Sequence, residues 1–172
     1  SVSVTLLGDF FLGEDAALDD VEAISDFLNK QPLTILNFEG ALGEGSLRKK
    51  SVNLKMSPGA TKLLGNSIVS LANNHILDYG QGGLKETLNS LSLARTPWFG
   101  LESHRGAADN FEVFEVAGTR ICMAGFGWRN EECVEATACD PGVVDFTKAN
   151  IQRTLARLSE ETYDFLLVYV HF

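Results

Sequence analysis

The chain has 172 residues, 45% of them hydrophobic, and a formal net charge of −9. This composition is typical of a globular protein, and the length suffices for one domain with a sizeable core, so we interpret residues 1–172 as a single domain. The acidic balance argues against nucleic acid as a partner and against simple adhesion to anionic lipid. No hydrophobic run approaches the length of a membrane helix, and no signal peptide is evident.

Three cysteines leave the redox compartment open. Their odd number allows at most one internal disulfide. Cys122 lies in a hydrophobic strand pattern, which predicts a buried thiol. Cys133 and Cys139 fall in a loop where they either pair or stay free, and their spacing matches no zinc-binding signature.

The first half of the chain alternates between predicted strands and helices. Residues 2–7, 33–36 and 68–72 are hydrophobic runs that predict strands, the first two of them buried. Hydrophobic residues at helical spacing predict helices between them. The first helix is expected over residues 18–28, with Leu18, Val21, Ile24 and Leu28 inward and Asp19, Asp20 and Glu22 in the first turn. The second is expected from Ser57 to about Leu64. The third is expected from Gly83 onward, with Leu84, Leu88 and Leu91 on one face.

The second half predicts an antiparallel element. Residues 96–100 suit a short strand, and residues 111–116 alternate strictly before a turn and a return strand over 120–126. A mixed sheet or two packed sheets follow from this hairpin. Thr147 is a suitable cap for a further helix, and residues 165–170 predict a last buried strand.

Polar side chains follow four of the predicted strands. If these strands are parallel neighbours, the polar groups meet at one edge of the sheet. Buried carboxylates and imidazoles are costly unless they are paired or bind a metal, and this donor set suits Mn²⁺, Fe²⁺ or Zn²⁺. The residues are Asp9; Asn37 and Glu39; Asn73, Asn74 and His75; and His171.

The turn after the third of these strands suggests acid–base chemistry. Asp78 follows His75 by three residues, close enough to orient the imidazole ring in a tight turn. A histidine beside a metal can protonate a leaving group. The alternative is purely structural, with Asn and Asp as caps and His75 hydrogen-bonded in the core, but it does not explain four similar strand ends.

Basic residues offer two candidate anion sites. Arg48, Lys49 and Lys50 lie in a glycine-rich loop, and we favour a solvated loop over a substrate site for them. Lys55 is the better candidate for binding an anionic substrate because its neighbours Leu54 and Met56 are hydrophobic.

The strand-end motifs resemble those of a known family. Gly8-Asp9, Asn37-Phe38-Glu39, Asn73-Asn74-His75 with Asp78-Tyr79-Gly80, and the strand ending at His171 resemble the bacterial capsule-synthesis family associated with poly-γ-glutamate. This family is a branch of the calcineurin-like metallophosphoesterase superfamily. The resemblance implies an α/β fold, a four-layer αββα sandwich with mixed sheets, and a site with one or two divalent metal ions.

The resemblance also implies roles for individual residues. Asp9, Asn74 and His171 are expected metal ligands, and Glu39 takes the place of a bridging aspartate. His75, with Asp78, is the expected catalytic acid or transition-state stabiliser. The expected substrate-binding residues are Asn37, Asn73 and Lys55.

Two departures from the superfamily pattern bear on these expectations. Phe11 stands where the first motif usually has a histidine, and the chain ends at Phe172, before a later Gly-His-x-His motif. One metal site is therefore expected to lack ligands, and we expect a C-terminally incomplete copy of the domain.

Two functions follow from the sequence. The first is a metal-dependent hydrolase-type domain in capsule or poly-γ-glutamate biosynthesis or processing, acting on a phosphoester or an anionic polymer. The alternative is a non-catalytic binding or assembly subunit of a membrane-bound polymer-synthesis complex. The resemblance implies an extracytoplasmic, membrane-associated place in the cell.

Overall fold

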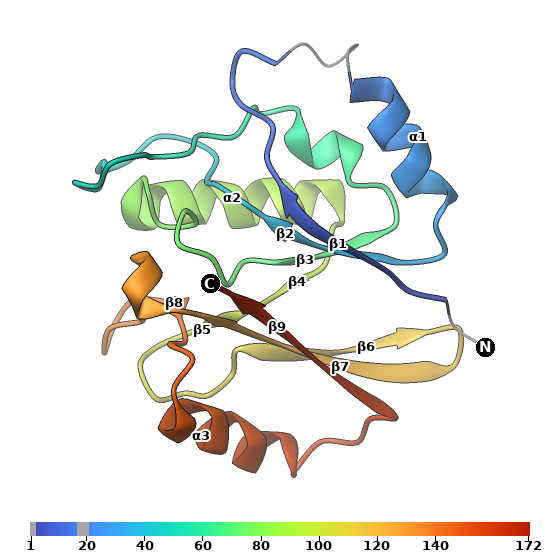
Figure 1. The fold of residues 1–172 in the computed structure, drawn as a ribbon, viewed down its shortest axis with the longest axis vertical. Helices are drawn as coiled ribbons and strands as arrows, with labels where there is room; N and C mark the ends of the chain where they lie inside the picture. The colour runs from blue at the N-terminus through green and yellow to red at the C-terminus, as the bar shows by residue number, and fades with distance from the viewer. Residues whose placement is uncertain (1–2, 17–20) are drawn as a thin grey trace. The chain divides into compact units, whose positions relative to one another are not determined.

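The computed structural model describes residues 3–16 and 21–172 (Figure 1). These residues form two compact units. The N-terminal unit comprises residues 3–69 and 75–98, and the C-terminal unit comprises residues 70–74 and 99–172. Both units combine sheet and helix, as the alternating hydrophobic patterns predict.

The N-terminal unit is built on a four-stranded sheet with the order β1-β2-β3-β4. Strands β1 and β2 are parallel, and their register places Asp9 opposite Asn37, with a shift between Leu6 and Asp9. Every residue of β2 and β3 is buried, which explains their continuous hydrophobic runs. The strands are β1 (Thr5–Phe10), β2 (Thr34–Phe38), β3 (Ser67–Ser70) and β4 (Trp98–Phe99).

In the described part of this unit, the sheet is accompanied by the helices α1 (Glu22–Lys30) and α2 (Gly80–Ala94) and the 3₁₀ helix η2 (Ala60–Leu63). Helix α1 buries Leu28, whereas Leu18, Asp19 and Asp20 of the predicted helix lie outside the described residues. The helix predicted from Ser57 is a shorter 3₁₀ helix. Helix α2 begins before the predicted Gly83.

The C-terminal unit contains a mixed sheet with the order β6-β7-β9. Strands β6 and β7 form the predicted antiparallel hairpin, and β9 joins β7 in parallel, with His171 opposite Gly127. A second, two-stranded sheet pairs β5 with β8. The strands are β5 (Leu101–Glu102), β6 (Phe111–Val116), β7 (Thr119–Gly127), β8 (Gly142–Val143) and β9 (Phe165–His171), and a 3₁₀ turn, η3 (Arg129–Glu131), follows β7.

Helix α3 (Lys148–Leu158) packs on the mixed sheet of this unit. The predicted cap is present, because the side chain of Thr147 accepts a hydrogen bond from the Asn150 amide. Ile151 on the helix packs against buried Ala124 and Phe126 of β7. One hydrophobic cluster of this unit therefore lies between α3 and β7.

Two expectations about the strands need correction. The first and last strands are not buried hydrophobic strands: Leu6 in β1 is 60% exposed and Phe165 in β9 is 65% exposed. Both strands are edge strands, so each has a neighbour on one side only. The four polar strand ends also do not share one sheet, because β9 belongs to the sheet of β6 and β7. Within the described ranges, no helix has the length and hydrophobicity to cross a bilayer.

Candidate metal and catalytic site

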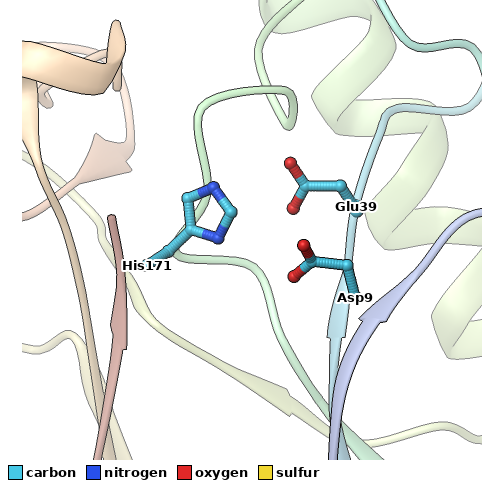
Figure 2. A group of neighbouring side chains, drawn as sticks. All are labelled: Asp9, Glu39 and His171. Atoms are coloured by element: carbon cyan, nitrogen blue, oxygen red, sulfur yellow. The ribbon is translucent and has the colours of Figure 1, made fainter.

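Two carboxylates lie together where β1 and β2 end. Asp9 is an exposed residue near the end of β1, and Glu39 directly follows β2 and is buried. Figure 2 shows the two side chains extending in the same direction from neighbouring strands. The parallel register of β1 and β2 produces this arrangement.

Asn37 joins the two carboxylates. Its amide nitrogen, fully buried in β2, donates a 2.8 Å hydrogen bond to Asp9 Oδ1 and a second, short one to Glu39 Oε2. The predicted substrate-binding Asn37 is thus placed behind the carboxylates and orients both of them. Like charges this close repel each other, and a cation between them relieves the repulsion. Carboxylate oxygens are the donors that Mn²⁺ and other hard divalent cations prefer, so the pair fits a divalent metal.

A histidine–aspartate pair lies in the turn between β3 and α2. His75 Nδ1 lies 2.7 Å from Asp78 Oδ2, so the predicted contact is present and the carboxylate accepts the Nδ1 hydrogen. The backbone forms the expected tight turn, with the Asp78 amide bonded to the His75 carbonyl at 3.0 Å. His75 Nε2 is 3.7 Å from Glu39 Oε1, beyond hydrogen-bonding distance. The imidazole is therefore fixed on one side and presents Nε2 on the side of Glu39.

Asp78 is held by two further donors that sequence reasoning missed. Lys50 Nζ lies 2.8 Å from Asp78 Oδ1, and the Leu54 amide donates a 2.8 Å hydrogen bond to Oδ2. Burial alone raises the pKa of Asp78, but the hydrogen bonds from His75, Lys50 and the Leu54 amide outweigh it and lower the pKa. Asp78 is consequently ionised at neutral pH.

The interpretation of the basic loop as solvated is wrong for Lys50. Its side chain is only 2% exposed and faces the fully buried Asp78. No local signal separates Lys50 from the exposed Lys49, because the pairing depends on a carboxylate in a later turn of the chain.

Lys55 lies among acidic groups instead of the expected hydrophobic ones. Its ammonium is 3.0 Å from Glu14 Oε1, contacts Glu44, and lies over the Tyr79 ring at 5.7 Å. Hydrogen bonds with Glu44 and Glu14 raise the pKa of Lys55. A substrate anion at Lys55 would have to compete with these two carboxylates.

The C-terminal unit brings together two other predicted ligands. His171 Nε2, at the end of β9, lies 3.1 Å from Asn74 Oδ1. The His171 carbonyl accepts a hydrogen bond from the Trp128 amide, which anchors the strand end. Asn73, next to Asn74, is fully buried. Phe11, in the position of the superfamily histidine, belongs to the N-terminal unit and is 45% exposed.

The comparison with protein families decides the classification. The model of the family described as "Bacterial capsule synthesis protein PGA_cap" matches residues 5–172. The chain belongs to this capsule-synthesis family. The resemblance seen in the strand-end motifs of this PGA_cap chain is thereby confirmed.

A curated relative agrees with this classification. The capsule biosynthesis protein CapA of Bacillus anthracis is 26% identical over 141 residues, which cover 73% of this chain and 34% of CapA. The PGA_cap chain thus spans about a third of the length of this relative.

Solved structures show the same fold. A hypothetical protein from Thermus thermophilus matches with a TM-score of 0.56 and 22% identity, over 98% of this chain and 57% of that protein. The NAD nucleotidase NadN of Haemophilus influenzae matches with a TM-score of 0.58 and 16% identity, over 99% of this chain and 34% of NadN. A 5'-nucleotidase described as putative, from Staphylococcus aureus, matches with a TM-score of 0.52 and 15% identity, over 98% of this chain and 36% of that protein. These likenesses confirm the predicted metallophosphoesterase-like α/β fold.

Proposed function

We propose that the PGA_cap chain is a metal-dependent, phosphoesterase-like hydrolase domain that acts in capsule biosynthesis on a phosphoester or on an anionic polymer such as poly-γ-glutamate. The observation that carries this proposal is the pair formed by Asp9 and Glu39, which Asn37 orients at the ends of two parallel strands. Membership of the capsule-synthesis family supports the biological setting.

The proposed cofactor is Mn²⁺, Fe²⁺ or Zn²⁺, as one or two ions. Asp9 and Glu39 are its proposed ligands in the N-terminal unit, and Asn74 and His171 are candidates in the C-terminal unit. When bound, such a cation polarises the ester oxygen and lowers the pKa of water. Asn37 would keep both carboxylates aimed at the cation, since its two amide hydrogens are already committed to them.

His75 is the proposed general acid. With its Nδ1 hydrogen bonded to Asp78, the imidazole has a fixed orientation, and we assign delivery of the proton to the leaving oxygen to Nε2. Asp78, whose pKa is lowered and whose side chain is buried, accepts the Nδ1 hydrogen and keeps the ring in this orientation.

The test is metal affinity. Binding of Mn²⁺ and Zn²⁺ is measured by calorimetry and by metal analysis for the wild type, Asp9→Ala and the control Asp15→Ala, which removes an exposed carboxylate close in sequence. We expect at least tenfold weaker binding in Asp9→Ala and no change in the control. A His171→Ala variant tests the proposed ligand of the C-terminal unit, and weaker metal binding is the expected result. A wild type that binds neither metal overturns the proposal.

A second candidate function is a non-catalytic subunit of a polymer-synthesis complex, favoured by Phe11 in place of a ligand histidine. Hydrolysis of a chromogenic phosphodiester separates the two. If the domain is a hydrolase, His75→Ala lowers kcat at least a hundredfold, the usual contribution of a general acid. His104→Ala is the control, because His104 lies in an exposed loop. Unchanged low activity in both variants favours the assembly function.

A further inference from the structure

The N-terminal unit contains a buried cation for which the proposed mechanism gives no role. Lysine is almost never fully buried unless it is paired, yet the side chain of Lys50 is 2% exposed. Its ammonium faces Asp78 Oδ1 at 2.8 Å and not the solvent. A substrate-binding lysine would need an accessible ammonium, so this position points to a role within the protein.

The loop that carries Lys50 is fixed against α2 and the turn that precedes it. The Leu42 amide donates to Thr87 Oγ1 at 2.8 Å, and the Arg48 amide donates to the Asp78 carbonyl at 2.9 Å. The contact is so close that a Cβ on Gly45 would lie 1.9 Å from the Tyr79 carbonyl oxygen. The backbone before Lys50 is therefore anchored to the turn that contains Asp78.

The two carboxylate oxygens of Asp78 have different partners. Oδ1 faces Lys50, and Oδ2 accepts hydrogen bonds from the Leu54 amide and from His75 Nδ1. Rotation of the carboxylate would break these contacts together. The lowered pKa of Asp78 agrees with this arrangement, because the donors outweigh the cost of burial.

We propose that Lys50 is a positioning residue, which holds the Asp78 carboxylate in the orientation that fixes the His75 ring with Nε2 on the side of Glu39. This inference rests on the proposed hydrolase function for its catalytic consequence, but not for the effect of Lys50 on the His75 ring.

The test compares Lys50→Met with Lys49→Met, which removes the exposed neighbouring charge. Two quantities are measured: the kinetic constants for a chromogenic phosphodiester with Mn²⁺ present, and the ¹H and ¹⁵N resonances of the His75 ring. For Lys50→Met we expect kcat at least tenfold lower, KM within twofold, and a shifted or broadened His75 Nδ1 hydrogen signal. Lys49→Met should match the wild type in both.

A double-mutant cycle covers the case in which Lys50→Met does not fold. Asp78→Asn is compared with the combined Lys50→Met and Asp78→Asn variant, which leaves no unpaired carboxylate. If Lys50 acts through Asp78, the two variants share the same kcat and the same His75 signal. A further loss in the combined variant shows an independent action and overturns the proposal.

The result that overturns the proposal directly is a folded Lys50→Met variant with the His75 resonances and kcat of the wild type. Failure of the proposed hydrolase function can be told apart from failure of the Lys50 proposal. If the wild type has no hydrolytic activity, the His75 spectrum alone decides whether Lys50 positions the ring. In that case a changed spectrum in Lys50→Met still supports the positioning role.

Discussion

Asn37 shows how one buried amide can organise an acidic site. Its two hydrogens bind one oxygen of Asp9 and one of Glu39, which come from neighbouring strands. An amide can do this without changing the net charge, whereas a lysine in the same place would neutralise one carboxylate. The amide therefore joins the two carboxylates without adding a positive charge to the proposed metal site.

Asn37→Leu should destabilise the protein. The variant removes two hydrogen bonds to carboxylates while keeping a side chain of similar size, so we expect a loss of about 2 to 3 kcal/mol in the free energy of unfolding. Urea denaturation measures it. Asn89→Leu, an exposed change on α2, is the control and should stay within about 0.5 kcal/mol. An equal effect of both variants would contradict the structural role of Asn37.

Asp78 should make the stability sensitive to acid. Because its pKa is lower in the folded state than in the unfolded chain, its contribution is fully present above its ordinary pKa of about 4 and is lost as the pH falls through the lower folded value. The difference in unfolding free energy between the wild type and Asp78→Asn should therefore shrink below about pH 4. Urea midpoints from pH 2.5 to 7 measure it, and a constant difference would count against this linkage.

At the scale of elements, a buried hydrogen-bond chain ties α3 to the sheet of its unit. Thr154 Oγ1 donates to Asn110 Oδ1 at 2.9 Å, and Asn110 Nδ2 donates to the Gly125 carbonyl at 2.6 Å. All three polar groups are buried, so each depends on the next for a partner.

Thr154→Val should loosen this helix. Valine has the same shape but no hydroxyl, so the Asn110 oxygen loses this donor at a cost of about 1 to 3 kcal/mol. Thermal unfolding and hydrogen exchange of the α3 amides measure the change. Thr162→Val, at an exposed position, is the control. Unaltered α3 protection in Thr154→Val would show that hydrophobic packing alone holds the helix.

The sequence predicted the positions of the strands and helices better than their exposure to solvent. Periodicity located β2, α2, the β6–β7 hairpin and the capped α3, because each has a local hydrophobic pattern and turn residues. The exposure of β1 and β9 was not predictable, since edge position depends on which strands pair and not on the strand itself.

In the candidate site, the contact between residues close in sequence was predictable, and the contacts between distant segments were not. The three-residue spacing in a turn was enough to foresee the contact of His75 with Asp78. The two hydrogen bonds that Asn37 donates to Asp9 and Glu39 were not foreseen, because the bond to Asp9 requires the parallel register of β1 and β2. The burial of Lys50 was also missed, because it arises from the packing of a loop on a distant helix start.

At the scale of the whole molecule, the three cysteines test the fold. All are free thiols; Cys122 and Cys133 are buried and Cys139 is exposed. Burial raises the pKa of Cys122 to about 11, aided by Glu161 and Glu112, so little of the reactive thiolate exists at neutral pH. We expect one thiol to react rapidly with a chromogenic disulfide in the native protein and three in urea. Fewer than three in urea would reveal a disulfide.

The division of the chain into units has a consequence for its biosynthesis. A ribosome has made all four strands of the N-terminal sheet once Phe99 is added, whereas the mixed sheet of the C-terminal unit waits for β9, residues 165–171. Until then the long strand β7 has a hydrophobic edge without its parallel partner, which invites wrong pairing. His171 reaches Asn74 only after β9 has been made, so this pair forms late relative to the sheet of the N-terminal unit.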